Sequence, residues 1–504
     1  MTLAIVYSRA SAGMHAPLVV VEVHLSRGMP LLNIVGLPEA AVKESKDRVR
    51  SALLNTCFEF PRSRITINLA PADLPKEGGR FDLPIALGIL AASGQLSDEK
   101  LKEYEFVGEL ALSGDLRPVR GVLPVVLATK EAGRTLIVPD TNAAEAALVK
   151  EANALSATHL LDVCAHLRGE TGLGLCQMNA APRVTQPVPD LQDVCGQPHA
   201  RRALEIAAAG KHSILFVGSP GTGKTMLASR LPGILPPLTD TQSLDVAALA
   251  SISRRGFDVR QWQAVPFRAP HHSSSSVALV GGGRPPQPGE ISLAHQGILF
   301  LDELPEFNRH VLECLREPLE SGSITISRAA WQTVFPAEFQ LVAAMNPCPC
   351  GFLGSTGRIC RCSPVQIQRY LGKLSGPLLD RIDMQVEVPA LPLEMLAADL
   401  SKKNESSASV KERVLHARSR QYDRQKKLNR DLTVSDLEHC CVLTDSVQAT
   451  LNKIIEKLNL SARVYHRIIK VARTIADLTG HDMIGANHIA EALNYRALDR
   501  ARQQ

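Results

Sequence analysis

Residues 218–225 read Gly218-Ser219-Pro220-Gly221-Thr222-Gly223-Lys224-Thr225, which is a complete phosphate-binding loop. An apolar run at 213–217 precedes the loop and a helix-like run at 226–230 follows it, so strand, loop and helix occur in the order that phosphate binding needs. Backbone N–H groups of such a loop surround phosphate oxygens at the helix N-terminus. The Lys224 ammonium can reach the β- and γ-phosphates, and the Thr225 hydroxyl can bind Mg²⁺. The stretch predicts a site for a nucleotide and Mg²⁺ in an α/β fold.

A second apolar run, residues 298–301, ends in the carboxylates of Asp302 and Glu303. The run is typical of a strand buried on both faces of a parallel sheet. Such a strand is usually only structural when it stands alone. Together with the loop at 218–225 it predicts a Walker B motif, in which Asp302 holds the Mg²⁺ shell and Glu303 polarises the water that attacks the γ-phosphate.

Three more polar residues follow in the order found in AAA+ ATPases. Asn346 ends the apolar run 342–345 and is expected to orient the attacking water as a sensor. Arg381 lies beside a turn at 376–383, and Arg463 lies at the start of a predicted helix. Either arginine taken singly is more typical of a surface salt bridge. In this order they predict a site that arginines of a neighbouring subunit complete, and hence a ring.

The composition is that of an ordinary globular protein. The 504 residues are 45% hydrophobic and 21% charged, which predicts about three domains. No run approaches the ~18 apolar residues of a membrane span and no signal peptide is recognisable, so we expect a cytoplasmic chain without membrane contact. The eleven cysteines indicate reduced thiols, with a metal site among them, and the net charge of +5 weakly indicates an anionic partner.

Periodicity divides the chain into four segments. Residues 1–170 mix alternating and helical stretches and predict an α/β domain, whereas residues 171–190 show little periodicity and predict a linker. Residues 191–390 carry the nucleotide motifs between short apolar strands and helices, which predicts a P-loop ATPase core. Residues 391–504 show helical periodicity and predict a helical lid domain.

The central and last domains resemble the magnesium-chelatase-like AAA+ family. Through the stretches Pro266–Ser275 and Pro288–His295, the whole chain resembles the competence-related bacterial members of that family. The resemblance implies an ATP-hydrolysing homo-hexamer with ATP and Mg²⁺ in its sites. It also implies that the ring moves on single-stranded and branched DNA and promotes branch migration of recombination intermediates during natural transformation, with recombination proteins as partners.

The first domain resembles the proteolytic domain of Lon, which has the fold of ribosomal protein S5 domain 2; the matching stretches are residues 75–82, 108–114 and 118–123. Lon requires a serine nucleophile and a lysine base. By these flanks, Arg80 stands at the serine position and Leu123 at the lysine position. We therefore expect a structural or partner-binding domain that is no protease, in which Arg80 forms a salt bridge with Asp82 or a neighbour rather than contacting DNA.

Residues 323–335 form two alternating runs around a short basic turn and predict a β-hairpin just before the Asn346 strand. In related replicative helicases a hairpin at this place projects a basic tip into the ring channel. By that resemblance Arg328 is the leading contact to the DNA backbone. The alternative is an exposed arginine on a structural hairpin.

Two further segments are candidates for a functional role. The glycine-rich stretch 278–288, with Arg284, predicts a second insert, and His271 and His272 before it are expected to form loop hydrogen bonds rather than to bind metal or act in catalysis. The basic run 411–430 can be a nucleic-acid surface but is more typical of a solvated helix face.

Cys348-Pro349-Cys350 and Cys360-Arg361-Cys362 enclose a glycine-containing loop, residues 348–362. Four thiolates on such a loop can surround one Zn²⁺ tetrahedrally, which predicts a small zinc knuckle. Redox-active or merely structural thiols are the alternative. The remaining cysteines form no ligand pattern and predict small core residues.

Three functions remain open on the sequence alone. A DNA-translocating hexamer explains the hairpin, the two arginines and the full-length resemblance. A magnesium-chelatase-type motor that remodels a protein partner shares the ATPase core. A Lon-like protease is disfavoured by Arg80 and Leu123.

Overall fold

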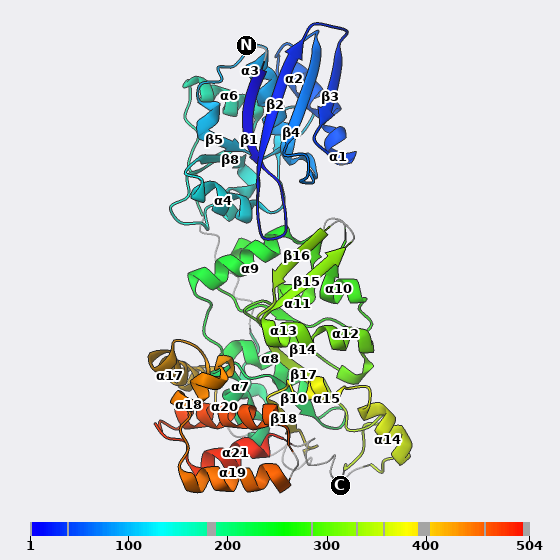
Figure 1. Cartoon of the computed structure of the whole chain (residues 1–504), viewed down its shortest axis with the longest axis vertical. Helices are drawn as coiled ribbons and strands as arrows, with labels where there is room; N and C mark the ends of the chain where they lie inside the picture. The colour runs from blue at the N-terminus through cyan, green and yellow to red at the C-terminus, as the bar shows by residue number, and fades with distance from the viewer. Residues whose placement is uncertain are drawn as a thin grey trace.

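The computed structural model describes residues 3–37, 40–178, 188–283, 286–328, 331–355, 358–391, 404–457 and 460–496. Figure 1 shows three stacked parts: an N-terminal α/β domain at the top, a second α/β unit in the middle and a group of helices at the bottom. The mixed α/β class predicted from the sequence is confirmed.

The N-terminal domain contains a seven-stranded sheet with the order β3-β4-β2-β1-β5-β8-β9. Its strands are β1 (Leu3–Arg9), β2 (Leu18–Ser26), β3 (Leu31–Val35), β4 (Arg64–Ala70), β5 (Tyr104–Phe106), β8 (Thr135–Pro139) and β9 (Ala154–Ala157). Alternate residues of β1, β2 and β4 are buried, as in strands with one face on a core. Helix α3 (Asp82–Ala92), which is buried along its whole length, packs on β1 and β2. The likeness of this domain to Lon stays a prediction.

The chain continues to bond with β9 beyond residue 170. Ser156 donates its backbone N–H to the carbonyl of Gly174 (3.1 Å), and Cys176 donates to the carbonyl of Ala154 (2.8 Å). The first part of the predicted linker therefore lies along this sheet. Residues 179–187 of the linker lie outside the described residues.

The central unit contains a five-stranded parallel sheet with the order β11-β14-β17-β10-β18. Its strands are β10 (Ile214–Val217), β11 (Phe267–Arg268), β14 (Ile298–Leu301), β17 (Gln340–Met345) and β18 (Met384–Glu387). All residues of β10, β14 and β17 are buried, which explains why each was recognisable as a continuous apolar run. Because the strands are parallel, the residues that follow β10, β14 and β17 meet at one edge of the sheet.

The two faces of this sheet are covered by different layers. Ile214 and Phe216 pack with helices α7 (Pro198–Gly210) and α8 (Lys224–Ile234). Leu215 and Val217 pack with the layer on the other face. That layer contains helices α9 (Asp240–Ile252), α10 (Ser276–Val280) and α12 (Arg309–Cys314), and the hairpin of β15 (Ser323–Arg328) and β16 (Trp331–Pro336).

The described residues 404–496 form helices that share the core of α7 and α8. They are α17 (Ser407–Gln425), α18 (Val434–Cys440), α19 (Asp445–Lys457), α20 (Ala462–Leu478) and α21 (Ala486–Asn494). Among the helices described anywhere in the chain, none combines the length and the apolar character that crossing a bilayer requires. The helical composition matches the prediction, whereas the role of a lid stays a prediction.

The basic run 411–430 is only in part the solvated face that was expected, because some of its cations bond within the protein. Arg418 donates to the carbonyl of Ala208 on α7 (2.6 Å), and its burial lowers its pKa to about 10. Arg413 pairs with Glu205 and Glu405, and Arg424 pairs with Asp477. These three side chains of α17 attach the C-terminal helices to the core and to one another. Each already has a partner within the protein and so needs no external anion.

The N-terminal domain packs on the core through α4 (Val122–Glu131) and α9, whose apolar side chains form a joint cluster. At this junction Gly121 donates its backbone N–H to the carbonyl of Ser251 (3.0 Å). Arg80 donates to the carbonyl of Arg120 (2.6 Å). Of the partners predicted for Arg80, Asp82 is wrong, because Asp82 accepts hydrogen bonds from Arg48 and Ser45 instead. A salt bridge of Arg80 with a neighbour stays a prediction.

The connection between β1 and β2 reaches down from the N-terminal domain to the hairpin (Figure 1). A Cβ added at Gly13 would lie 2.6 Å from the Thr333 methyl group of β16, so the Gly13 backbone lies directly against that side chain. Met14 packs against the apolar cluster of the core. The predicted hairpin is therefore present, and its second strand is in contact with the first domain.

Candidate active site

The loop after β10 holds its lysine over its own backbone. The Lys224 ammonium donates to the carbonyls of Gly218 (2.7 Å) and Ser219 (2.9 Å) and to Asn346 Oδ1 (3.1 Å). Burial lowers the pKa of Lys224, and the nearby carboxylates of Asp302 and Glu303 oppose that shift. The loop reaches this shape through left-handed glycines, with φ of 89° at Gly223 immediately before α8.

The residues after β14 face this loop. The Thr225 hydroxyl donates to Asp302 Oδ2 (2.7 Å), so the two predicted Mg²⁺ ligands already adjoin. A hydroxyl and a carboxylate oxygen are the ligand types that Mg²⁺ prefers, and this donor set fits the ion. Glu303 follows in a left-handed conformation with φ of 53°, which is costly for a residue with a side chain.

His272 contacts the predicted catalytic carboxylate. Its Nδ1 lies 3.1 Å from Glu303 Oε2, and its ring packs on that of His271 with 4.1 Å between centroids. His271 bonds only locally as far as the described contacts show, to the Ser273 hydroxyl (2.7 Å). The expected loop hydrogen bond is present at His271, whereas His272 contacts a residue far along the chain. That neither histidine binds metal or acts in catalysis stays a prediction.

These residues line a pocket of about 390 Å³. Its lining consists of Pro220, Gly221, Thr222, Gly223, Lys224, Thr225, Met226, Asp302, Glu303, Met345 and Asn346. The structure therefore brings together the predicted loop, the Walker B residues and the predicted sensor.

Tyr370 is a buried neighbour of the predicted sensor. It lies on α14 (Pro364–Leu371), is 6% exposed and is near enough to the Asn346 backbone for that backbone to lower its pKa slightly. Burial, the largest cause, outweighs this and raises the pKa of Tyr370 to about 12, so its hydroxyl stays protonated.

The predicted arginines lie elsewhere. Arg381 follows α15 (Gly376–Leu379), is 5% exposed and pairs with Glu320 on α13 (Arg316–Ser321) at 2.5 Å. Arg463, at the start of α20, points its guanidinium at the same Glu320 oxygen from 4.0 Å and is 61% exposed. Neither is among the described residues that line the pocket. We call Arg381, Arg463 and Glu320 the arginine cluster.

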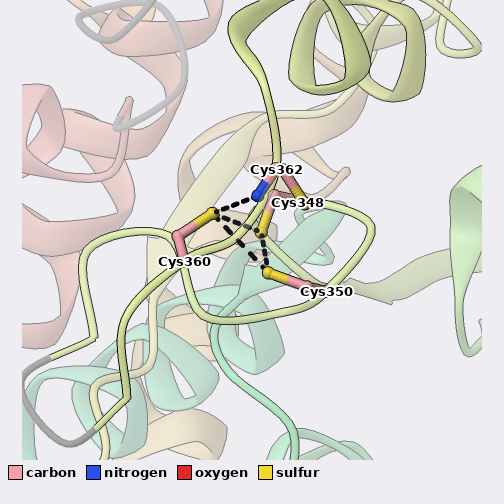
Figure 2. A group of neighbouring side chains, drawn as sticks. All are labelled: Cys348, Cys350, Cys360 and Cys362. Carbon is pink, nitrogen blue, oxygen red and sulfur yellow. Dashed lines mark hydrogen bonds between the residues drawn. The ribbon is translucent and has the colours of Figure 1, made fainter.

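The four predicted metal ligands converge (Figure 2). The sulfur of Cys348 lies 3.4 Å from that of Cys350 and 3.7 Å from that of Cys360, and the latter two are 3.6 Å apart. The Cys362 sulfur completes a group whose members all lie within 4.8 Å of one another. A tetrahedral zinc site with Zn–S bonds of about 2.3 Å separates its sulfurs by roughly 3.8 Å, whereas a disulfide requires about 2.05 Å. The spacing fits a bound metal better than a disulfide.

The predicted DNA contacts are placed only in part. The backbone of Arg328 ends β15 opposite Trp331, and nothing beyond that backbone is described for Arg328. In the glycine-rich insert, Gly281–Gly282 pairs with Gln287–Pro288, whereas Arg284 lies outside the described residues.

Three residues of these sites were missed from the sequence: His272, Glu320 and Tyr370. His272 follows β11, the neighbour of β14, so the rule that parallel strands end at a common edge is the one signal that points to it. Glu320 and Tyr370 lie on helices without a local motif. Only the packing of distant segments reveals them.

Three family profiles match the chain. "Magnesium chelatase, subunit ChlI" matches residues 190–396, "Subunit ChlI of Mg-chelatase" matches 21–142, and "Magnesium chelatase, subunit ChlI C-terminal" matches 404–496. The nucleotide pocket and the arginine cluster thus lie in segments of the magnesium-chelatase-like AAA+ class.

Comparison with individual relatives narrows the class of protein further. Competence protein ComM of Haemophilus influenzae is 55% identical over 100% of this chain and 99% of its own length. YifB of Salmonella typhimurium is 53% identical over 99% of this chain and 98% of its own. The magnesium-chelatase 38 kDa subunit of Cereibacter sphaeroides is 24% identical over 39% of this chain and 57% of its own. The chain belongs to the ComM/YifB family of magnesium-chelatase-like AAA+ proteins.

Proposed function

We propose that this protein is an ATPase whose subunits form a hexameric ring that moves on single-stranded and branched DNA and drives branch migration. The observation that supports the proposal is that the pocket and the arginine cluster lie apart within one subunit. Lys224, Asp302 and Glu303 line the pocket, whereas the arginines that stabilise transition-state charge lie in the arginine cluster. A pocket of one subunit is then completed by the arginine cluster of the next.

The residues divide the chemistry of ATP hydrolysis among them. Lys224 exchanges its bonds to the loop carbonyls for bonds to the β- and γ-phosphates. Thr225 and Asp302 hold Mg²⁺, which neutralises phosphate charge when bound. Glu303 and Asn346 orient the attacking water, and Glu303 accepts its proton. Arg381 and Arg463 then act across the subunit boundary.

DNA as the partner rests on the hairpin and on the relatives. Arg328 is our candidate for a contact to the DNA backbone without base readout, and the support is that its position ends β15 of the hairpin. A role in natural transformation, with recombination proteins as partners, follows from the relative named a competence protein. We also propose that Cys348, Cys350, Cys360 and Cys362 hold one Zn²⁺.

The alternative is a magnesium-chelatase-type motor that remodels a protein partner. The matches of all three chelatase profiles favour it, whereas the much higher identity and coverage of ComM favour the DNA motor.

The deciding experiment compares ATP hydrolysis without DNA and with single-stranded, duplex and four-way-junction DNA. A DNA motor is stimulated by DNA, and Arg328→Ala should then keep basal hydrolysis while losing DNA affinity, salt dependence and junction migration. Arg255→Ala, an exposed arginine of the same central unit outside the hairpin, is the matched control. Hydrolysis indifferent to every DNA would reject the DNA motor and favour the protein-remodelling alternative.

A further inference from the structure

The cysteine loop, residues 348–362, is joined to the nucleotide pocket at both of its ends. It begins two residues after Asn346, which accepts a hydrogen bond from Lys224. It ends next to Ser363, the N-cap of α14, and the buried Tyr370 of α14 lies near the Asn346 backbone. The segments that flank the loop on both sides therefore reach the predicted sensor.

The loop also touches the phosphate-binding loop directly. Gly351 has φ of 82°, and a Cβ added there would lie 2.6 Å from Pro220 Cδ and 3.8 Å from Asn346 Cγ. Only glycine permits this approach without strain. Cys348 is fully buried in the same region, so a metal bound by the four sulfurs lies against the wall of the pocket.

We propose that the metal held by Cys348, Cys350, Cys360 and Cys362 is a clamp that positions Asn346 and Pro220 for ATP hydrolysis. A metal that joins the four cysteines removes conformational freedom from the segment between β17 and α14. This inference rests on the proposed ATPase site. Asn346 acts on the attacking water while Lys224 binds phosphate, so loss of the metal should lower kcat and leave nucleotide affinity nearly unchanged.

The test combines Cys350→Ser/Cys360→Ser with reversible metal removal from the wild-type protein by a chelator. We expect one zinc per chain in the wild type, loss of zinc from the variant, and a kcat lower by about 10- to 100-fold. Hydrogen exchange should rise at residues 345–352 and at the loop 218–223, and added Zn²⁺ should reverse both effects in the chelated wild type. Cys57→Ser/Cys314→Ser, outside the cluster, is the matched control.

Two results would overturn the clamp: a wild type without stoichiometric metal, or metal loss that changes neither kcat nor exchange at these segments. Failure of the proposed function is distinguishable, because a wild type without ATPase activity would still report the clamp through exchange.

A second and independent observation concerns Glu320. Arg381 is buried and donates to the Pro377 carbonyl (2.7 Å) and to Glu320, while its Nε has no hydrogen-bond partner among the described residues. Arg463 faces the same Glu320 oxygen. One half-exposed carboxylate thus pairs closely with Arg381 and lies near Arg463 within a single subunit, and its single charge leaves the group with a net positive charge.

Glu320 is joined to the hairpin by a short stretch of chain. It lies at the end of α13, and only Ser321 and Gly322 separate it from β15. A further bond joins the two elements, since the Thr325 hydroxyl donates to Glu317 Oε1 (3.3 Å). A shift of Glu320 therefore moves the base of the hairpin.

We infer that Glu320 is the resting counter-ion of Arg381, and that the γ-phosphate of a neighbour's ATP replaces it and thereby moves α13 and the hairpin. This inference also rests on the proposed function. Glu320 is a positioning residue here, because it acts through Arg381 and touches no substrate.

The test is Glu320→Gln, with Glu313→Gln on α12, which pairs with Arg316, as the matched control. Removing the competing carboxylate should raise hydrolysis without DNA by about 3- to 10-fold and lower the ratio of DNA-stimulated to basal hydrolysis towards one. Arg381→Ala/Glu320→Gln should equal Arg381→Ala alone if Glu320 acts through Arg381. A fall in basal hydrolysis, or an additive double variant, would overturn the inference, whereas an Arg381→Ala protein with normal activity would reject the proposed function itself.

Discussion

The nucleotide pocket and the arginine cluster belong to the same subunit but are built in opposite ways. The pocket gathers residues at the carboxyl ends of β10, β14 and β17, and each is preceded by a buried apolar strand. The arginine cluster joins a short turn, the first residue pair of α20 and the last turn of α13. A parallel sheet concentrates motifs at one edge, whereas helix packing brings together charges that no motif marks.

The two regions also differ in electrostatics. Lys224 in the pocket bonds neutral carbonyl oxygens, so its charge is available to phosphate. Arg381 is paired with Glu320, and hydrogen bonding by Arg381 lowers the pKa of that carboxyl. The pocket lysine thus faces neutral oxygens, whereas Arg381 already holds a carboxylate. The following predictions test this difference.

The largest effect is expected for Lys224→Ala. The change removes the only lysine among the residues that line the pocket, and charge-assisted bonds to phosphate contribute about 1.5–3 kcal/mol each. Nucleotide affinity should fall by about 100-fold or more and hydrolysis should become unmeasurable. Titration with a fluorescent ATP analogue checks this, with Lys373→Ala, a partly exposed lysine paired with Glu306, as the control. Wild-type affinity would reject the pocket as the nucleotide site.

Arg381→Ala should abolish hydrolysis while leaving nucleotide affinity intact, because the arginine lies outside the pocket of its own subunit. Arginine fingers contribute about 10³- to 10⁵-fold to kcat. In mixtures with wild-type subunits, activity should fall more steeply than the mutant fraction, because each pocket borrows a neighbour's arginine. A fall in simple proportion would show that Arg381 acts within its own subunit, and would remove the contrast between the two regions.

Glu303→Gln should impair hydrolysis but not binding, unlike Lys224→Ala in the same pocket. The amide keeps the shape of the side chain but cannot accept the proton of the attacking water, so ATP should bind normally while kcat falls by about 10²- to 10⁴-fold. Single-turnover hydrolysis with ATP in the presence of Mg²⁺ measures the step directly. Glu306→Gln, three residues on, is the matched control. Unaltered turnover would reject the Walker B assignment.

The sequence was sufficient where a strand and a motif are adjacent along the chain. The loop at 218–225, Asp302 and Asn346 could be placed together because buried parallel strands are continuous apolar runs with a common carboxyl edge. It was insufficient where the partner is distant, as for Glu320 and His272. Of the two alternatives predicted for Arg80, the pairing with Asp82 failed for the same reason, since Arg48 from a neighbouring helix pairs with that carboxylate.

Arg463→Ala should have a smaller effect than Arg381→Ala. Its side chain is 61% exposed and lies 4.0 Å from Glu320, so solvent screens its charge in the isolated subunit. We expect kcat to fall by about 10-fold or less, with a larger fall at low than at high salt. Measuring kcat at two ionic strengths beside Arg381→Ala checks the order. An Arg463 effect equal to that of Arg381 would mean that both arginines are fully engaged in the working ring.

The smallest effect is expected for His272→Ala. His272 Nδ1 lies 3.1 Å from Glu303 Oε2, but the Glu303 side chain is 52% exposed, and pairs that exposed contribute about 0.2–1 kcal/mol. If His272 only orients Glu303, kcat should fall by about 1.4- to 5-fold with unchanged nucleotide affinity. His271→Ala, which loses a bond to Ser273 and none to Glu303, should leave kcat as it is. A fall of the size expected for Glu303→Gln would instead mean that His272 takes part in accepting the proton. The pocket would then depend on a residue outside any sequence motif, as the arginine cluster depends on Glu320.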